Sequence, residues 1–167
     1  MRQDMMSTEL DEVAGRVAAR LIARRETIAV AESSAGGLLS AALLAVPGAS
    51  RYFLGGAVVY TATAREALLG ISLDDMAGMR SSSEPYARLL AERSRIAFQA
   101  SWGLAETGAA GPTGNRYGDA AGHSCLAISG PSSRVETLET GLSDRAANMR
   151  LFAIQALALL EQALDQA

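Results

Sequence analysis

The fold is decided by residues 27–39, which read Thr27-Ile28-Ala29-Val30-Ala31-Glu32-Ser33-Ser34-Ala35-Gly36-Gly37-Leu38-Leu39. The apolar run at the start is typical of a strand buried on both faces, and the Ala/Leu stretch that continues to Val46 is typical of a packed helix. Either serine can cap that helix. The stretch therefore predicts a strand, a tight turn and a helix, the repeating corner of an α/β fold.

The turn between this strand and helix has two interpretations. Two glycines beside a first helical turn cost about 1 kcal/mol each relative to alanine, and close approach of a ligand to bare backbone is one reason to keep them. Free N–H groups would then face an anion or a developing oxyanion beside a serine hydroxyl. In the purely structural interpretation, Ser33 or Ser34 only caps the helix and the glycines let helix and sheet touch.

Composition predicts one ordinary domain over residues 1–167. A chain of 167 residues that is 49% hydrophobic should bury roughly 70% of its unfolded surface. The single cysteine, Cys125, excludes an internal disulfide framework, and with the single histidine, His123, it leaves no Cys/His cluster for a metal. We expect neither a metal nor a cofactor. His123 beside Cys125 is interpreted as a packing residue.

Charge and hydropathy exclude two classes of partner. The net charge is -3, and the basic residues, all arginine, are scattered among acids without a basic stripe, so we expect no nucleic acid partner. The first residues lack the pattern of a signal peptide, and the apolar run from Leu38 to Val46 is too short to cross a bilayer. We therefore expect a cytoplasmic protein that does not enter a membrane.

Periodicity along the rest of the chain predicts alternating helices and strands within a core of about residues 8–164. The first helix is expected to be capped by Ser7 or Thr8. Residues 71–83 and 115–121 are expected to be irregular. Further strands are expected at 53–60, 104–107, 122–128 and 134–140, the last two as an antiparallel pair, and further helices at 62–69, 84–100 and 144–164. This order predicts an α/β fold, a three-layer α/β/α sandwich with a mixed sheet of about five strands.

Two glycine-bearing turns, at 32–37 and 107–114, follow two of the predicted strands. If those strands are parallel, both turns lie at the carboxyl edge of the sheet, where open α/β folds bind ligands. Neither turn matches a phosphate-loop or dinucleotide pattern. Tyr60 and Arg65 bracket the end of the strand at 53–60, and their ordinary interpretations are an interfacial aromatic and a solvated helix charge. Arg145 is likewise typical of a surface arginine at a helix start.

Taken together, these positions resemble the CinA C-terminal domain family from about residue 8 to 164. The matching motifs, in order, are Glu32-Ser33-x-x-Gly36-Gly37, Val46-Pro47-Gly48-Ala49-Ser50, Gly56-x-Val58-x-Tyr60-x-x-x-Ala64-Arg65, Leu69-Gly70, Ser83-Glu84, Thr107-Gly108-x-Ala110-Gly111-Pro112 and Gly122. The resemblance implies a three-layer α/β/α domain that is usually a homo-oligomer. It also implies a nicotinamide mononucleotide amidohydrolase, which forms nicotinic acid mononucleotide and ammonia without a metal.

The resemblance also implies the roles of particular residues. The catalytic serine of the family falls on Ser33, its site tyrosine on Tyr60, its site threonine on Thr107 and its late arginine on Arg145. Substrate contacts are expected from Ser34, Gly36, Gly37, Gly108, Gly111 and Arg145. The usual Cys-Thr after the serine is Ser34-Ala35 here, and the usual Gly-Gly-rich, Lys-Pro-bearing loop is altered over residues 113–118.

A third departure concerns catalysis directly, because the usual lysine five residues after the tyrosine is Arg65. A buried lysine can lose its proton and accept one from serine, whereas a guanidinium with a pKa above about 12 stays charged. Arg65 can still bind a phosphate or carboxylate, or support Tyr60 as the base. Three hypotheses follow: a nicotinamide-nucleotide amidase with Ser33, Tyr60, Arg65 and Thr107 in its site; a lapsed nucleotide-binding or interaction module; and an amidase with another substrate.

Overall fold

Strand β1 (Ile28–Glu32) is completely buried, as its apolar sequence predicts. In this computed structural model, which describes residues 1–167 except the side chain of Gln3, β1 lies inside a five-stranded sheet of order β2-β1-β3-β4-β5. Its neighbours β2 (Phe53–Val58) and β3 (Trp102–Ala109) both run parallel to it. Strands β4 (His123–Ser129) and β5 (Arg134–Glu139) continue the sheet in antiparallel fashion. The predicted mixed sheet is therefore confirmed.

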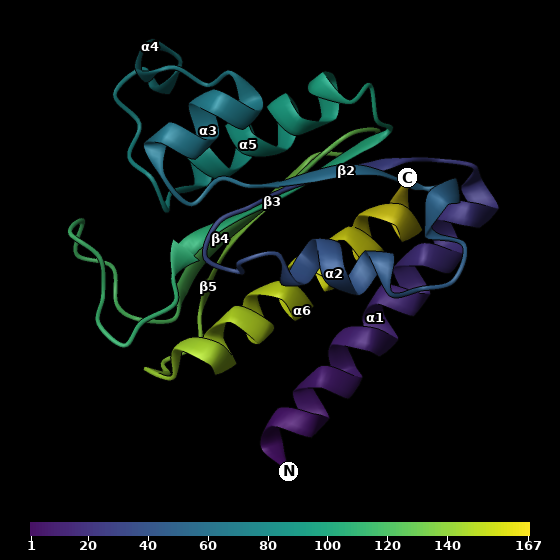
Figure 1. The fold of residues 1–167 in the computed structure, drawn as a ribbon, viewed down its shortest axis with the longest axis horizontal. Coiled ribbons are helices and arrows are strands. Elements are labelled where there is room, and N and C mark those ends of the chain that lie inside the picture. Colours follow the sequence, from purple (N-terminus) through teal and green to yellow (C-terminus); the bar gives the residue numbers. More distant parts are fainter.

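Helices cover both faces of the sheet, which confirms the three-layer α/β/α architecture (Figure 1). One layer consists of α1 (Arg2–Arg24), α2 (Leu38–Leu44) and α6 (Arg145–Gln166), and the short 3-10 turn η1 (Ala49–Arg51) follows α2. The other layer consists of α3 (Ala62–Leu69), α4 (Leu73–Met76) and α5 (Glu84–Ala97). None of the helices in the described chain combines the length and the hydrophobicity needed to span a bilayer.

Two apolar clusters, one on each face of the sheet, hold these layers together. Ile28 and Val30 of β1 belong to the cluster under α1 and α6, whereas Ala31 belongs to the cluster under α5. This alternation follows from the two-residue period of a strand. On α1, the expected apolar positions Leu10, Val13, Val17 and Leu21 are all buried. Each such leucine or valine contributes roughly 1.5–3 kcal/mol by leaving water.

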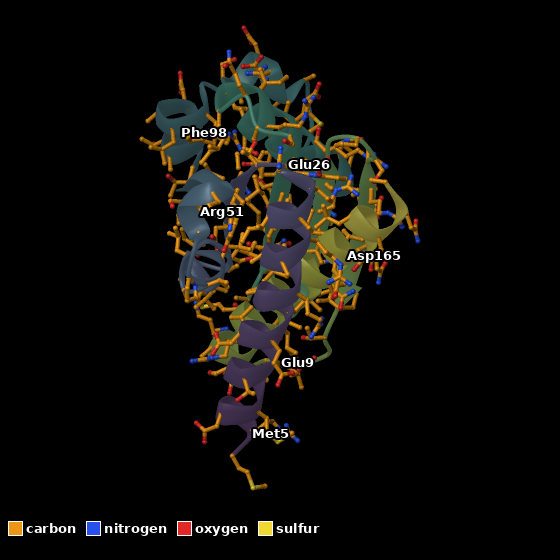
Figure 2. All side chains as sticks on the ribbon, turned by 90° about the vertical axis from the view of Figure 1, so that its right-hand side faces the viewer. Met5, Glu9, Glu26, Arg51, Phe98 and Asp165 are labelled. Carbon is orange, nitrogen blue, oxygen red and sulfur yellow. The ribbon has the colours of Figure 1, made fainter. Side chains whose placement is uncertain are left out.

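Helices α1 and α6 also meet through ion pairs along their exposed sides. Nε of Arg20 lies 2.7 Å from Oδ1 of Asp165, and Nε of Arg16 lies 2.8 Å from Oε1 of Glu161. Figure 2 shows Asp165 near the end of α6 beside α1, and Met5 on the turns of α1 that project beyond the sheet. Exposed pairs of this kind contribute at most about 1 kcal/mol each, so the apolar contacts dominate.

Several predicted element boundaries were wrong for local reasons. Helix α1 begins at Arg2, and the Thr8 hydroxyl donates to the Asp4 carbonyl inside the helix instead of capping it. Residues 71–83 contain helix α4, which begins at a capping box between Ser72 and Asp75. Helix α5 is capped by Ser83 as predicted but ends at Ala97. The antiparallel pairing of β4 and β5 is confirmed.

Candidate functional site

The turn after β1 is held by a buried acid at the end of the strand, not by a serine cap. Helix α2 begins after Gly37, whose φ of 102° lies in the left-handed region. As a glycine, this N-cap residue has no side chain that could cap the helix. The Glu32 carboxylate accepts hydrogen bonds from the backbone N–H groups of Gly37, Leu39 and Ser40 instead. The prediction that Ser33 or Ser34 caps this helix was therefore wrong, because Glu32 already satisfies the free N–H groups of its first turn.

A second buried acid, Glu106 of β3, fixes the same turn from the neighbouring strand. Its carboxylate accepts the backbone N–H of Ser33 at 3.0 Å, that of Ala35 at 2.8 Å and the Ser34 hydroxyl. The Ser124 hydroxyl of β4 donates to it at 3.2 Å. Burial raises the pKa of the Glu106 carboxyl; these hydrogen bonds oppose the shift and the negative charge of nearby Glu32 adds to it.

These contacts determine which polar groups of the turn remain available. Gly36 N–H donates to the Ser33 carbonyl, and the N–H groups of Ala35 and Gly37 go to Glu106 and Glu32. Within the described part of the chain, the Ser34 N–H and the Ser33 hydroxyl have no hydrogen-bond partner. The expected oxyanion contacts from Gly36 and Gly37 are therefore not available, and the Ser34 N–H is the donor that remains.

The half-buried Ser33 opens onto a cavity of about 270 Å³ at the carboxyl ends of β1, β2 and β3. Tyr60, Arg65, Thr107 and Gly108 line the same cavity. Ser33 and Thr107 are 74 positions apart in the sequence, and Tyr60 and Arg65 lie between them. All four meet at this cavity because parallel strands end at the same edge of a sheet. Within the described residues, no cluster of three or more His, Cys, Asp or Glu side chains could hold a metal ion.

Tyr60 separates this cavity from a second one of about 210 Å³. Ser34, Gly108, Gly111 and Arg145 line the second cavity, whereas Gly36 and Gly37 line neither of the two. The wall also includes Thr113, Gly114 and Asn115, which belong to the loop that departs from the family pattern.

The tyrosine is held by Arg145 and not by Arg65. Nη2 of Arg145 donates to the Tyr60 hydroxyl at 3.2 Å, and Nη1 donates to the Gly111 carbonyl at 2.6 Å. Nη1 of Arg65 lies 3.5 Å from the Ser81 hydroxyl, and its guanidinium lies over the Tyr86 ring, 5.6 Å from the centroid. The expected partnership of Tyr60 with Arg65 is thus replaced by one with Arg145.

With this geometry in place, sequence comparison assigns the family. The CinA C-terminal domain family matches residues 10–164, which is nearly the whole chain. The chain belongs to this family. It is 42% identical over 154 residues to a CinA-like protein of Anaeromyxobacter dehalogenans and 41% identical over 128 residues to one of Gloeobacter violaceus. These matches cover 92% and 77% of this chain but only 38% and 30% of the relatives, so the domain spans about a third of their length.

Solved structures of the family share the fold. A competence-damaged protein (CinA) superfamily protein from Klebsiella pneumoniae superposes with a TM-score of 0.88 at 26% identity, over 95% of this chain and 99% of the other. A superfamily member from Enterobacter cloacae gives 0.85 at 31% identity, over 93% of this chain and 92% of the other. The three-layer mixed-sheet domain is therefore the architecture of the CinA superfamily.

Thr107 and His123 connect the site to a buried polar cluster behind it. The Thr107 hydroxyl accepts the Ser82 N–H at 3.2 Å, and Nε2 of His123 lies 2.8 Å from the Ser82 carbonyl. Nδ1 of His123 bonds Glu139, and Asp119 lies 3.6 Å from Nε2. Burial lowers the pKa of His123, but the Glu139, Ser82 and Asp119 contacts outweigh it and the pKa is raised. The interpretation of His123 as a packing residue therefore missed a charged network.

The residues that sequence reasoning missed are the two buried acids. Glu32 and Glu106 are register partners on adjacent strands, and neither exposes surface to solvent. An available signal was that each acid interrupts a buried apolar strand just before a glycine-bearing turn. Such an acid must be paired or hydrogen-bonded, and the donors nearest to it are the N–H groups of that turn.

Proposed function

We propose that this domain is an amide hydrolase that converts nicotinamide mononucleotide and water to nicotinic acid mononucleotide and ammonia. The observation that carries the proposal is the uncommitted Ser33 hydroxyl, which shares a cavity of about 270 Å³ with Tyr60 and Thr107. The turn that presents Ser33 is fixed by two buried carboxylates, which supplies the preorganisation that a nucleophile needs.

In the proposed reaction, Ser33 Oγ attacks the carboxamide carbon and the Ser34 N–H binds the developing oxyanion. The Ser33 proton passes to the Tyr60 oxygen while Tyr60 gives its own proton to the departing nitrogen. The C–N bond then breaks, ammonia leaves and an ester on Ser33 remains. Water cleaves that ester and restores the serine. The scheme uses neither a cofactor nor a metal ion.

Other residues of the site position the reactants in this scheme. Because Arg145 donates to the Tyr60 oxygen, the phenolic hydrogen is left to point toward the substrate. Thr107 accepts the Ser82 N–H, so its own hydroxyl hydrogen is free to donate to the nucleotide. Ser34, Gly108 and Gly111 form the adjoining surface on which the substrate lies.

Release of ammonia from nicotinamide mononucleotide tests the proposal. We expect turnover by the wild type and its loss in Ser33→Ala, with Ser7→Ala on the exposed side of α1 as the matched control. No ammonia from the wild type at high enzyme concentration would reject the amidase function.

The position of Arg65 favours a second candidate function. This guanidinium lies on the Ser33 cavity where the family has lysine, and it cannot act as a base at neutral pH. A lapsed domain that binds nucleotides without cleaving them would show ligand-dependent thermal stabilisation and no product. The altered 113–118 loop, which lines the second cavity, favours instead an amidase with a different substrate.

The setting in which the domain works is part of the same proposal. We expect a cytoplasmic homo-oligomer with a small-molecule nucleotide as ligand and without nucleic acid or membrane partners. Sedimentation of the purified protein with and without nicotinamide mononucleotide tests the oligomeric state.

A further inference from the structure

A third hollow, which Arg145 does not line, adjoins the Ser33 cavity. It encloses about 330 Å³ between α3, α4 and the altered loop, and Tyr60, Ala62, Arg65 and Ser81 line both it and the Ser33 cavity. The hollow and the Ser33 cavity are therefore immediate neighbours that share these side chains. Arg116 of the altered loop also lines the hollow.

The charge of the hollow is positive and unbalanced. Arg65 and Arg116 line it, and the described residues of its wall include no carboxylate. The Arg65 guanidinium contacts the Ser81 hydroxyl and the Tyr86 ring. Nη2 of Arg116 donates to the Tyr117 hydroxyl at 2.9 Å, and its guanidinium lies 5.0 Å from the centroid of the same ring. By contrast, the arginines with a carboxylate within 4 Å are Arg16, Arg20, Arg24, Arg80 and Arg93. Two guanidinium groups without a carboxylate partner form a ready site for an oxyanion.

The remaining walls of the hollow suit the organic part of such a ligand. Leu73, Met76 and Met79 form an apolar side, and the hydroxyls of Tyr60, Ser81 and Tyr117 provide hydrogen-bond partners. Leu73 is 80% exposed, although it is a large apolar side chain. A hollow with two cations, several hydroxyls and an apolar side matches a sugar phosphate better than an inorganic ion.

The loop that supplies Arg116 is held firmly in place. Arg80 bonds both oxygens of Asp119, at 2.6 and 3.2 Å, and Nδ2 of Asn115 donates to Oδ2 of Asp119 at 2.8 Å. Oδ1 of Asn115 accepts the N–H groups of Tyr117 and Asp119. Because Asp119 neutralises Arg80, the charge left for a ligand is that of Arg65 and Arg116.

We propose that this hollow is the phosphate subsite of the substrate, with Arg65 and Arg116 as the residues that bind the phosphate. The proposal deepens the proposed function and rests on it for the identity of the reacting amide. Arg145 does not fill this role, because its Nη1 and Nη2 already donate to Gly111 and Tyr60. On this assignment Arg65 is a binding residue and not a base, so a permanent charge suits its position.

The test compares nicotinamide mononucleotide with nicotinamide riboside, which lacks the phosphate. Calorimetric titration uses the full chain with Ser33→Ala, so that binding is measured without turnover. We expect the mononucleotide to bind at least tenfold more tightly than the riboside. We expect Arg65→Gln and Arg116→Gln each to weaken mononucleotide binding about tenfold, the effect of one charge-assisted hydrogen bond.

The matched control is Arg150→Gln, because Arg150 is a surface arginine that donates only to the Ala146 carbonyl of its own helix among the described residues. It should leave both affinities within twofold. Equal weakening of both ligands by Arg116→Gln, or no weakening of mononucleotide binding, would overturn the phosphate subsite. Adenosine monophosphate serves as a second ligand that carries the same phosphate on a different nucleoside. Failure of both nicotinamide mononucleotide and adenosine monophosphate to bind would overturn the phosphate subsite as well.

The outcomes separate this subsite from the amidase function. Phosphate-dependent binding that Arg116→Gln weakens, without ammonia release by the wild type, keeps the subsite and rejects the amidase. Ammonia release together with unchanged mononucleotide affinity in both arginine variants keeps the amidase and rejects the subsite.

Discussion

Arg145, at the start of α6, donates to the hydroxyl of Tyr60, which follows β2, across 3.2 Å, and the same guanidinium holds the Gly111 carbonyl at 2.6 Å. One side chain thus ties the last helix to the ends of β2 and β3. Because Tyr60 is 58% exposed, this contact fixes its orientation at the place where three cavities meet.

Loss of Arg145 should therefore impair turnover more than stability. In Arg145→Met we expect kcat/KM for ammonia release to fall about 10- to 100-fold, the equivalent of one charge-assisted hydrogen bond, and Tm to change little. Arg150→Met is the control and should retain activity, because this arginine of the same helix donates to the Ala146 carbonyl and not to Tyr60. Equal kcat/KM in the two variants would contradict the role of Arg145 in positioning Tyr60.

Removal of the Glu106 carboxylate should destabilise the domain strongly. Glu106→Ala leaves the N–H groups of Ser33 and Ala35 without an acceptor in a buried site. We expect the free energy of unfolding in urea to fall by about 2–5 kcal/mol. Glu92→Ala, at an exposed position of α5, should change it by less than about 0.5 kcal/mol. A similar small change in Glu106→Ala would show that the turn does not depend on this acid.

Stability should depend on the protonation of His123. Both ring nitrogens face acceptors, the Glu139 carboxylate and the Ser82 carbonyl, so the charged ring satisfies both contacts, and its pKa is raised in the fold. A raised folded pKa adds stability that is complete below the unfolded value of about 6.5 and is lost as pH rises through the folded value.

The measurement is Tm between pH 5.5 and 8 for the wild type and for His123→Gln. We expect the Tm advantage of the wild type to shrink as pH rises, and Glu139→Gln to reduce the same pH dependence. An advantage that is constant or grows with pH would mean that the ring is neutral in the fold.

The sequence predicted the architecture because that information is local. Apolar runs such as Ile28 to Ala31, helix ends such as Gly70 and the Ser83 cap each follow from the chemistry of a few adjacent residues. The parallel order of β1 and β3 then brought Ser33 and Thr107 to one edge without further information.

The contacts that the sequence did not reveal join distant segments. The bonds from Glu106 to the Ser33 turn and from Arg145 to Tyr60 span 73 and 85 positions. The choice between Arg65 and Arg145 as the partner of Tyr60 depends on where α6 begins relative to β2, which no local pattern determines. Only the folded chain decides between them.

The packing of α5 on β3 gives a prediction for the core. A Cβ at Gly103 would lie 2.0 Å from the Ala91 carbonyl oxygen of α5, so Gly103→Ala must displace the helix. We expect a loss of about 1–3 kcal/mol in urea unfolding. In Gly15→Ala no atom beyond the adjacent residues and the local helix backbone lies within 4 Å of the added Cβ, and α1 should gain about 1 kcal/mol. The free energy of unfolding should therefore fall in Gly103→Ala and rise in Gly15→Ala. A change of the same sign in both variants would contradict the prediction.

Arg65→Lys tests what the family lysine position does in this chain. The substitution restores a group that can lose its proton but removes the planar fork that binds a phosphate through two N–H groups. If Tyr60, positioned by Arg145, transfers the proton and Arg65 binds the phosphate, Arg65→Lys should lower kcat/KM for nicotinamide mononucleotide about fivefold, mainly through KM. The pH profile of kcat should then gain no new ionisation.

A rise of kcat by tenfold or more, with a new basic limb near neutral pH, would instead mean that the wild-type domain lacks a proton acceptor. The binding-module function would then be correct for the natural sequence, because only the lysine would complete a Ser-Lys site around Ser33.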